Sequence, residues 1–448
     1  MATNKNTQGM QRTQAVLDTF PEAMAAKVPA LTAYNSAEVG AAILSDAALM
    51  NCFAPGILNA ILDPNVRSAE TRALYSEFTS DMPFGGTYAE VFVDEIEPYD
   101  WDSCSNEASF QKLFGLDDIP AYGLYFTKNF SKQGKATITT KDIRKAFRDW
   151  AGVNDLYDRV INSLYVGLIN SENRAASAIF LDAHNNGKAK PVLVNSAFET
   201  TNDSGAHVLE TEALQWNAAQ INAAALRMSI SGSREYSWMG VSTMTPLDRL
   251  HFFLLPEYAS AQTIGVLSVS FHMDQTELMG RIHVVPDFGG AEDEGTIGFM
   301  IDREWLKIKL EAGGRVMTGE YNAQKLAINY FLTEEAVMAH IDFYNAVEFT
   351  SKIRPITAVA VTASQSASKA KRANQIAATI TPNSATPDGA YYSKLNWSIS
   401  GQKSDFTHIT PFGALILGSD ETASTINVTA TSAQDPSKTS TQPVTITA

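Results

Sequence analysis

The sequence predicts a mixed α+β body followed by an all-β sandwich at the C-terminus. Three observations lead to this prediction: a change of composition near residue 357, a long helical pattern over residues 140–187, and two alternating strand runs before that pattern. The chain has 448 residues, of which 45% are hydrophobic. A chain of this size can build a large core or several lobes.

The first 34 residues are polar and show no hydrophobic period. Such a segment is typical either of an arm that orders only against a partner or of a disordered terminus. The next stretch places Val39, Ile43 and Met50 at helical spacing, after a possible N-cap at Ser36. We therefore expect an N-terminal arm over residues 1–34 and a short helix after it.

Two strand-like runs, residues 88–97 and 122–130, flank a polar, turn-rich stretch. Their apolar side chains alternate at period two, so the runs can pair as a long hairpin. Because a two-stranded hairpin has little core and exposes its backbone edges, it needs a neighbour for stability. We predict that it contacts other subunits through the alternating residues Tyr88, Val91, Val93, Tyr122, Leu124 and Phe126.

Charge is segregated between the two sides of this hairpin. One interpretation is that both sides are simply solvated faces. The other is that acidic and basic stretches of adjacent copies meet and set their register, which would guide assembly because exposed ion pairs contribute only about 0–1 kcal/mol each. The candidate residues are acidic on the first side and basic on the second: Asp94, Glu95, Glu97, Lys128, Lys132 and Lys135.

The helical pattern over residues 140–187 is the clearest single element. Ile143, Phe147 and Trp150 share one face, and later apolar residues continue it. A helix of about 35 residues would be roughly 50 Å long, which is more than a compact small domain needs, so we interpret it as a spine. Gly152 interrupts the pattern near Trp150 and is the predicted hinge of this spine.

The rest of the body carries mixed signals. An Ala-rich helix is expected over residues 210–227, and a second helix over residues 258–268. Strands are expected at residues 250–255, 282–285 and 297–301, and most of residues 305–349 also has strand character. This alternation predicts an α+β lobe.

The tail differs in composition from everything before it. Residues 357–448 contain 15 Thr, 13 Ser and 15 Ala, with six basic and five acidic residues and no Cys. The preceding part then has 28 basic and 44 acidic residues, a net charge of −16. Short alternating runs bounded by turn residues predict a β-sandwich with Trp397 as its core aromatic.

Charge and cysteine usage exclude several classes of protein. A net charge of −15 argues against binding nucleic acid through clustered basic residues, although it is compatible with lying beside DNA. Cys52 and Cys104 are isolated and predict free thiols. We also expect no membrane span, because no stretch approaches about 20 apolar residues. No secretory signal is visible at the N-terminus, so cytoplasmic synthesis is expected.

Motifs for catalysis or cofactor binding are not found in the sequence. The chain has no phosphate-binding loop, zinc-binding HExxH, nucleophile elbow or CxxC pair. Glu292, Asp293 and Glu294 are consecutive and lack the spaced ligands of a calcium loop. We therefore predict a protein without catalytic residues, metal or cofactor.

Several segments resemble those of a known family. They include MPFGGTYAEVFVD (82–94), TTKDIRKAFRDW (139–150), VINSLYVGLINSE (160–172) and GFMIDREWLKIK (298–309). AEVGAAIL (37–44) and LMGRIHVVPDF (278–288) extend the resemblance over nearly the whole body. On these residues the chain resembles the major capsid proteins of phi29-like short-tailed phages. The tail resembles bacterial immunoglobulin-like (group 2) domains in the segments AATITPNSATP, LNWSISG, GALILG and STINVTATS.

The resemblance implies a Hong Kong 97-like (Johnson) capsid fold within residues 1–350. It implies an N-arm (1–34), an extended loop (82–139), a spine helix (140–187) and peripheral and axial parts (188–350). A linker (351–356) and an immunoglobulin-like domain (357–448) would follow. Such a protein assembles with itself into hexamers and pentamers around phage double-stranded DNA, as an icosahedral or elongated head in the virion.

The resemblance also implies partners and leaves alternatives. A scaffolding protein, a portal and a head fibre or decoration protein are expected partners, with packaged DNA nearby but not specifically bound and no membrane. The tail is expected outside, either bridging capsomers or contacting the host surface. Two alternatives are a cell-surface adhesin, for which immunoglobulin-like tails are common, and a bacterial nanocompartment shell protein.

Overall fold

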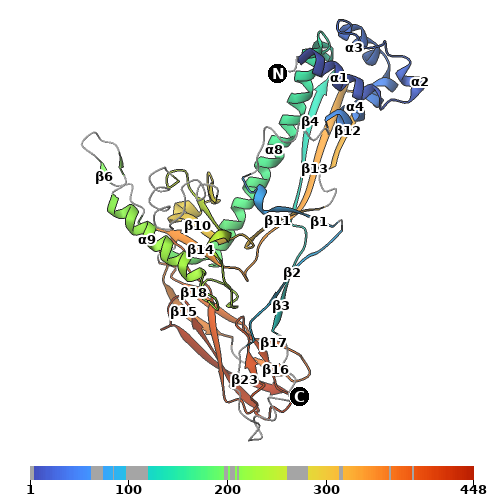
Figure 1. Cartoon of the computed structure of the whole chain (residues 1–448). Coiled ribbons are helices and arrows are strands. Elements are labelled where there is room, and N and C mark those ends of the chain that lie inside the picture. The colour runs from blue at the N-terminus through green and yellow to red at the C-terminus, as the bar shows by residue number, and fades with distance from the viewer. Residues whose placement is uncertain are drawn as a thin grey trace. The chain divides into compact units, whose positions relative to one another are not determined.

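The computed structural model describes residues 5–61, 74–83, 85–96, 120–195, 200–201, 207–208, 211–259, 281–311, 316–362, 365–385 and 388–447. The chain forms two compact units, each made from several stretches of sequence. The first unit comprises residues 1–88, 126–176 and 308–338. The second comprises residues 89–125, 177–307 and 339–448. Figure 1 labels the elements of both.

The first unit contains the N-terminal helices α1 (Lys5–Leu17), α2 (Glu22–Ala25), α3 (Ser36–Ser45) and α4 (Ala47–Ile61). The arm predicted for residues 1–34 is therefore helical over much of its length, and Val16, Leu17 and Phe20 are buried in the core. The sequence pattern missed α1 because Gly9 and Thr13 lie on its packing face, two turns and one turn before Val16 and Leu17. Glycine is required there, since an added Cβ would lie 1.9 Å from the Trp150 carbonyl oxygen.

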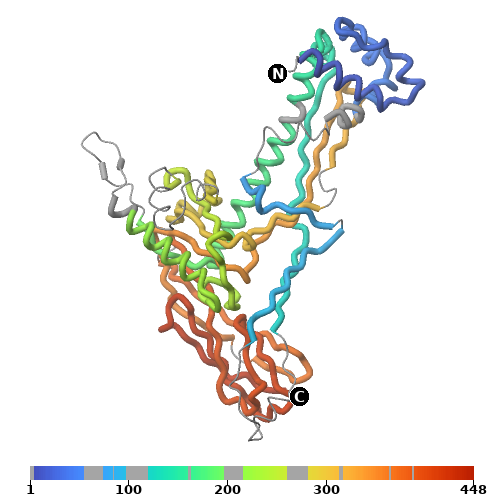
Figure 2. The backbone as a smooth tube through the Cα atoms, in the orientation of Figure 1, coloured from blue at the N-terminus to red at the C-terminus, as the bar shows by residue number. Residues whose placement is uncertain are grey.

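A five-stranded sheet completes the first unit. It has the order β1-β11-β13-β12, and β4 also pairs with β13. The strands are β1 (Thr79–Met82, after the short 3-10 helix η1, Ser76–Phe78), β4 (Phe130–Thr139), β11 (Leu306–Glu311), β12 (Val316–Asn322) and β13 (Ala327–His340). Figure 2 shows β4 and β13 side by side, in an antiparallel register that runs from Thr139 opposite Ala327 to Phe130 opposite Ala336.

Helix α8 (Trp150–Asn185) is the predicted spine. The short helix α7 (Thr140–Ala146) precedes it and begins with a capping box, in which the Thr139 side chain accepts from the Asp142 backbone and Asp142 reaches back to the Thr139 backbone. The two helices are separated at residues 147–149, next to the interruption that the sequence predicted near Trp150 and Gly152. Residues of α8 up to Ala176 belong to the first unit, and those from Ser177 onward belong to the second.

The second unit is built on a sheet of order β5-β14-β10-β8-β9. Its strands are β5 (Lys190–Leu193), β8 (Leu250–Leu254, after η2, Leu247–Arg249), β9 (Ile282–Val284), β10 (Thr296–Asp302, after η3, Ala291–Glu294) and β14 (Ala346–Thr350). Helix α9 (Thr211–Met228) buries Ile221, Ala225 and Met228 in a cluster with residues of this sheet. The strands predicted at 250–255, 282–285 and 297–301 are thus confirmed, whereas the helix predicted at 258–268 falls mostly outside the described residues.

Two further pairs of strands belong to the body. Strands β2 (Tyr88–Val93) and β3 (Ala121–Phe126) form the predicted hairpin pair, and β6 (Thr200–Thr201) pairs with β7 (His207–Val208). The second predicted run, 122–130, is divided, because β3 ends at Phe126 and β4 begins at Phe130 in a different sheet.

The tail is all-β, as predicted. It contains β15 (Ile356–Val361), β16 (Ser366–Ser368), β17 (Asn374–Gln375), β18 (Ala378–Pro382), β19 (Leu395–Ser400), β20 (His408–Ile409), β21 (Ala414–Ile416), β22 (Thr425–Ser432) and β23 (Thr439–Thr447). These strands form sheets β15-β18, β16-β23-β22-β19 and β17-β21-β20. Val361, Leu415, Val428 and Val444 are among the residues of its buried cluster. Assignment to the immunoglobulin-like class stays a prediction.

Candidate assembly surfaces

The outward face of the β2–β3 hairpin is apolar and exposed. Val91 is 62% exposed and Val93 is 59% exposed, although both lie in a strand. Tyr125 on β3 is 75% exposed, and Ile96 just after β2 is 66% exposed. The sequence analysis named Val91 and Val93 but missed Tyr125 and Ile96. Tyr125 could have been found, because it lies on the opposite face from Leu124 by strand alternation.

The other predicted hairpin residues face their own chain. Tyr88 stacks on Phe126 with ring centroids 6.1 Å apart, and both belong to the first unit. In the second unit, the Tyr122 ring meets Phe412 of the tail edge-on at 4.7 Å. Leu124 is half-buried. Of the six predicted contact residues, only Val91 and Val93 are therefore substantially exposed.

Asp94 fixes the end of β2 to the body of the second unit. Its buried carboxylate accepts hydrogen bonds from the Ser242 backbone at 2.9 Å and from Arg234 Nη1 at 3.1 Å. Arg234 Nη2 also lies 3.4 Å from a carboxylate oxygen of the exposed Glu95. Asp94 and Glu95 thus pair within one chain. Glu97 lies outside the described residues.

On the basic side, Lys128 is also paired within its own unit. Its Nζ lies 2.7 Å from Glu311 and 2.9 Å from Glu335, and these bonds raise the pKa of Lys128. Lys132 and Lys135 are exposed on β4, with Lys135 Nζ 5.5 Å from the centre of the Phe331 ring. Lys132 and Lys135 are therefore the predicted charge-pairing residues best placed for contact with another copy.

Gly152 and Trp397 occupy more specific places than the sequence indicated. Gly152 lies in the first turn of α8, where an added Cβ would be 2.7 Å from the Ala146 carbonyl oxygen, so glycine is needed for the tight passage between α7 and α8.

Trp397 is half-buried at the edge of the tail's cluster. It lines a cavity of about 350 Å³, together with Trp238 and Phe412, so it is not at the centre of the tail core.

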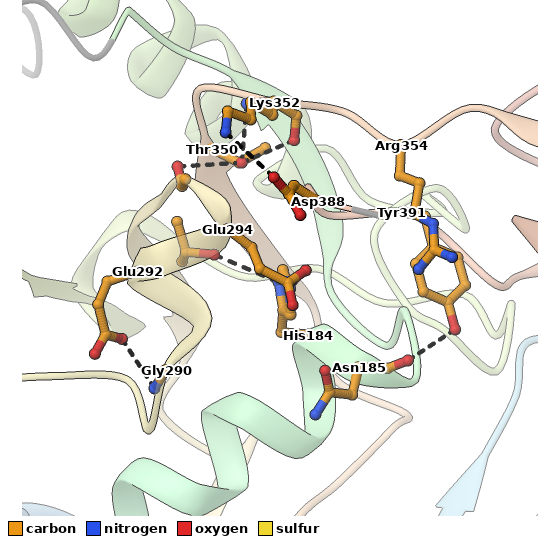
Figure 3. A network of polar contacts seen from close by, with 12 residues as sticks. His184, Asn185, Gly290, Glu292, Glu294, Thr350, Lys352, Arg354, Asp388 and Tyr391 are labelled. Carbon is orange, nitrogen blue, oxygen red and sulfur yellow. Dashed lines mark hydrogen bonds and ion pairs between the residues drawn. The ribbon is translucent and has the colours of Figure 1, made fainter. Parts of the chain in front are cut away.

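The C-terminal end of α8 holds a buried ionic network (Figure 3). His184 Nδ1 lies 2.7 Å from Glu348 on β14, and its Nε2 lies 3.0 Å from Glu294 on η3. Both His184 and Glu348 are buried. Burial opposes the charged imidazole, but the hydrogen bonds and charges of Glu348 and Glu294 outweigh it and raise the pKa of His184 to about 9.

The neighbouring Glu292 accepts hydrogen bonds from the Phe288 and Gly290 backbones, at 2.9 and 3.2 Å. The acidic run at 292–294 therefore makes bonds within its own chain through Glu292 and Glu294.

The tail binds the end of α8 directly. Tyr391 donates its hydroxyl to the Asn185 carbonyl at 2.8 Å, as Figure 3 shows, and the Ser393 backbone donates to the Gly187 carbonyl at 2.9 Å. The Ser393 hydroxyl also donates to the Asn186 carbonyl at 2.6 Å. These carbonyls at the helix end have no partner further along the helix, so the tail caps α8.

Two buried tail side chains strengthen this junction. The Tyr392 hydroxyl lies 3.0 Å from the Glu235 carbonyl oxygen and 3.2 Å from that of Ser237. Lys394 is buried, its Nζ donates to the Arg234 carbonyl, and burial lowers its pKa to about 8. The tail therefore packs on the body through specific hydrogen bonds.

The predicted linker is also tied down. The Ala390 backbone donates to the Lys352 carbonyl at 3.1 Å, and the Arg354 backbone donates to the Ala390 carbonyl at 2.8 Å. The Thr350 hydroxyl donates to the Lys352 carbonyl at 2.9 Å, and Lys352 Nζ lies 3.8 Å from Asp388 (Figure 3). Residues 352–354 are therefore held against the tail.

Comparison with known protein families identifies the family to which the chain belongs. The model for the phi29-like phage major capsid protein matches residues 13–350, which is three quarters of the chain. The chain belongs to this family. This assignment selects the capsid interpretation over the adhesin and nanocompartment alternatives, and it places the protein in a structural family rather than an enzyme family.

The chain is also similar to individual proteins. The major capsid protein of Bacillus phage B103 is 25% identical over 399 residues, covering 88% of this chain and 84% of that protein. The major capsid protein of Bacillus phage PZA is 24% identical, over 90% of this chain and 85% of that protein. A chain in the capsid structure of Staphylococcus phage Andhra covers 64% of this chain and 86% of its own length, with a TM-score of 0.48 and 12% identity.

The capsid protein therefore associates with itself to form the shell of a phage head, and its place is the virion capsid. Among the described residues, no single helix has both the length and the apolarity to cross a membrane. The pair α3 and α4, bent by 109°, passes that test only when its two helices are taken together.

Proposed function

We propose that the capsid protein adopts a Hong Kong 97-like fold, in which the β2–β3 hairpin is the extended loop that lies on a neighbouring copy. The observation that carries this proposal is the exposed apolar face of the hairpin, with Val91, Val93, Ile96 and Tyr125. Side chains of this type seldom gather on the exposed face of one strand pair unless another molecule covers them. Charged residues at the hairpin base pair internally, so the apolar face remains for the neighbour.

In this proposal the assembled shell consists of hexamers and pentamers around packaged double-stranded DNA. The acidic body supports a wall that does not bind the DNA, because like charge prevents adhesion of the phosphates. A scaffolding protein, a portal and a head fibre or decoration protein would be its partners. The binding energy would come from many interfaces of ordinary size repeated by symmetry.

The tail would be an immunoglobulin-like (group 2) domain on the outside of the shell. Its nearly balanced charge differs from the acidic body and supports a position away from the DNA. There it would bridge capsomers or contact the host surface. Because Tyr391, Tyr392 and Ser393 bind the body, the tail would hold a defined orientation rather than hang on a flexible linker.

Substituting Val91 tests the role of the hairpin. Val91→Asp should leave the unassembled protein folded, because exposed substitutions usually change stability by less than about 0.5 kcal/mol. It should block shell formation, because assembly would bury an unpaired carboxylate. Val91→Thr is the matched control, since it keeps the size and β-branching and should assemble.

Shell formation is measured by electron microscopy and sedimentation, with the folding of each variant checked by circular dichroism. If Val91→Asp forms shells in normal yield, the hairpin face is not an interface between copies. That result would leave the family assignment unchanged and would remove only the proposed role of the extended loop.

A further inference from the structure

Helix α9 has two apolar faces, and the core formed by the described residues uses one of them. Ala218, Ile221, Ala225 and Met228 are buried in the cluster around the β5-β14-β10-β8-β9 sheet. A surface helix normally shows polar residues on the side away from its core. In α9 that side is also apolar, and packing among the residues that the structure describes does not explain it.

The second face follows a heptad spacing. Its five residues are separated by three, four, three and four positions, and all five are exposed: Trp216, Ala219, Ala223, Leu226 and Ile230. Trp216 is 39%, Leu226 50% and Ile230 60% exposed. Ile230 follows the end of α9 but continues its turn, because the Ser229 and Ile230 backbones still donate to the Ala225 and Arg227 carbonyls. We call these five residues the α9 seam.

The spacing indicates what kind of segment covers the seam. Apolar residues repeating every 3.5 positions form a narrow stripe that fits one partner helix side by side. A flat sheet or an extended peptide would not require this period. The alanines at two of the five positions allow the partner helix to approach closely. The partner surface is therefore an amphipathic helix.

Charge favours an identical chain as the source of that helix. The positions flanking the seam are Gln215, Gln220, Asn222, Arg227 and Ser229, with one charge among five. Copies of this chain repel one another because each has an acidic body. Since no carboxylate flanks the seam, a contact between two seams would add no further repulsion between copies. A different partner would be expected to select this helix through complementary charges, which the flanks do not offer.

The size of the seam gives the same answer. An aromatic side chain buries roughly 150–250 Å² when fully covered, so the exposed parts of five residues amount to roughly 300–400 Å² per copy. Two such faces bury well below the roughly 1,200–2,000 Å² of a stable, specific interface. The seam alone cannot hold a dimer in solution, but it suits a contact that forms when a shell holds copies next to each other.

We propose that the α9 seam is an interface between copies of this capsid protein and is covered by a helix of a second copy in the assembled shell. The inference rests on shell formation by this family. It concerns α9 and not the β2–β3 hairpin, so the two interfaces can be tested independently.

A pair of substitutions on α9 provides the first test. Leu226→Glu places a carboxylate in the seam, and Gln215→Glu places the same group beside it. Leu226→Glu should reduce the yield of shells at least about tenfold, because the seam would have to bury a charge. Gln215→Glu should assemble in near-normal yield. Circular dichroism and the thermal midpoint of the unassembled chains should match those of the unmodified protein.

A photoreactive amino acid at Ala223, the centre of the seam, identifies the partner. In shells we expect a crosslinked product of twice the chain mass, with peptides of this chain on both sides of the link. The unassembled protein should give no such product. Shells that crosslink Ala223 to a different protein, or to nothing, would overturn the proposal, as would normal assembly by Leu226→Glu. None of these outcomes would affect shell formation as the function.

Discussion

His184→Gln should make the capsid protein less stable near neutral pH and less sensitive to pH. In the folded protein His184 lies between Glu348 and Glu294, and its pKa is raised to about 9. In the unfolded chain a histidine has a pKa near 6.5. The folded state therefore binds more protons between these two values, and the free energy of unfolding falls as pH rises through this interval.

The size of the effect follows from the two pKa values. Their difference corresponds to roughly 3 kcal/mol, at about 1.4 kcal/mol for each pH unit. This stabilisation is fully present below about pH 6.5 and is lost as the pH rises through about 9. Considered from the side of the buried Glu348 carboxylate, the same interaction has a similar magnitude, because removing the cation from a buried pair costs about 3–5 kcal/mol.

Urea unfolding at about pH 6 and about pH 10 measures this difference. The unmodified protein should exceed His184→Gln by roughly 3 kcal/mol at the lower pH, and the gap should narrow at the higher pH. Some pH dependence will remain in the variant. This remaining dependence comes from His340, which lies 3.1 Å from Asp182 and 2.7 Å from Asp342. Burial disfavours the charged form of His340, but the two carboxylates outweigh it and raise its pKa to about 9.

His408→Gln is the control, because His408 is exposed in the tail. It should change the free energy of unfolding by less than about 0.5 kcal/mol, as exposed substitutions usually do. The reasoning would be refuted by a stability gap between the unmodified protein and His184→Gln that stays constant from about pH 6 to about pH 10. An NMR titration that places the pKa of His184 below 6.5 would refute it as well.

Three further substitutions test the tail junction, the tail itself and the spine. Tyr392→Phe removes a hydroxyl that lies between two carbonyls, so it should lower the free energy of unfolding by about 1–3 kcal/mol and with it the thermal midpoint. The control, Tyr125→Phe on the exposed hairpin face, should lower it by less than about 0.5 kcal/mol. Equal thermal midpoints of the two variants would show that the hydrogen bonds of Tyr392 do not stabilise the junction. Burial opposes ionisation of Glu421, but hydrogen bonds from the backbones of Ala423, Lys403 and Ser404 outweigh it and lower the pKa of Glu421 to about 2. Glu421→Gln should therefore lower the free energy of unfolding of the tail by roughly 1.5–3 kcal/mol above about pH 4.5. This difference should fade as the pH falls through about 2. Proteolysis of the tail at neutral pH measures the first part of this prediction, and unchanged susceptibility would contradict it. Gly152→Ala should lower stability by about 1–3 kcal/mol because its Cβ would meet the Ala146 carbonyl, and a variant with unchanged stability would rule out this close contact.

The sequence alone determined the elements whose own residues carry a period. The helical face of α8, the alternation in β2 and β3, and the short strands of the tail are local patterns, and the structure contains each of them. The resemblance to a capsid family also came from local segments, and the family match confirmed it. The sequence pattern did not predict helix α1, because Gly9 and Thr13 form part of its packing face and neither residue counts as apolar in a periodic pattern.

Only the tertiary structure decided which residues meet. Asp94 is paired with Arg234, 140 positions later, and His184 is paired with Glu348, 164 positions later. No periodicity connects such positions, since the contact depends on how sheets and helices pack. For this reason the sequence predicted the charged hairpin residues as contacts between copies, while the fold satisfies Asp94 and Glu95 within one chain.

The same reason explains the tail and the α9 seam. Composition separated residues 357–448 as a differently built part, but it could not show that Tyr391 and Ser393 cap α8 or that residues 352–354 are held against the tail. Likewise, the apolar residues of α9 are visible in the sequence, yet burial alone separates those that face the sheet from the five of the seam. Helices and strands follow from the local sequence pattern, whereas the faces that stay exposed are set only when these elements pack against one another.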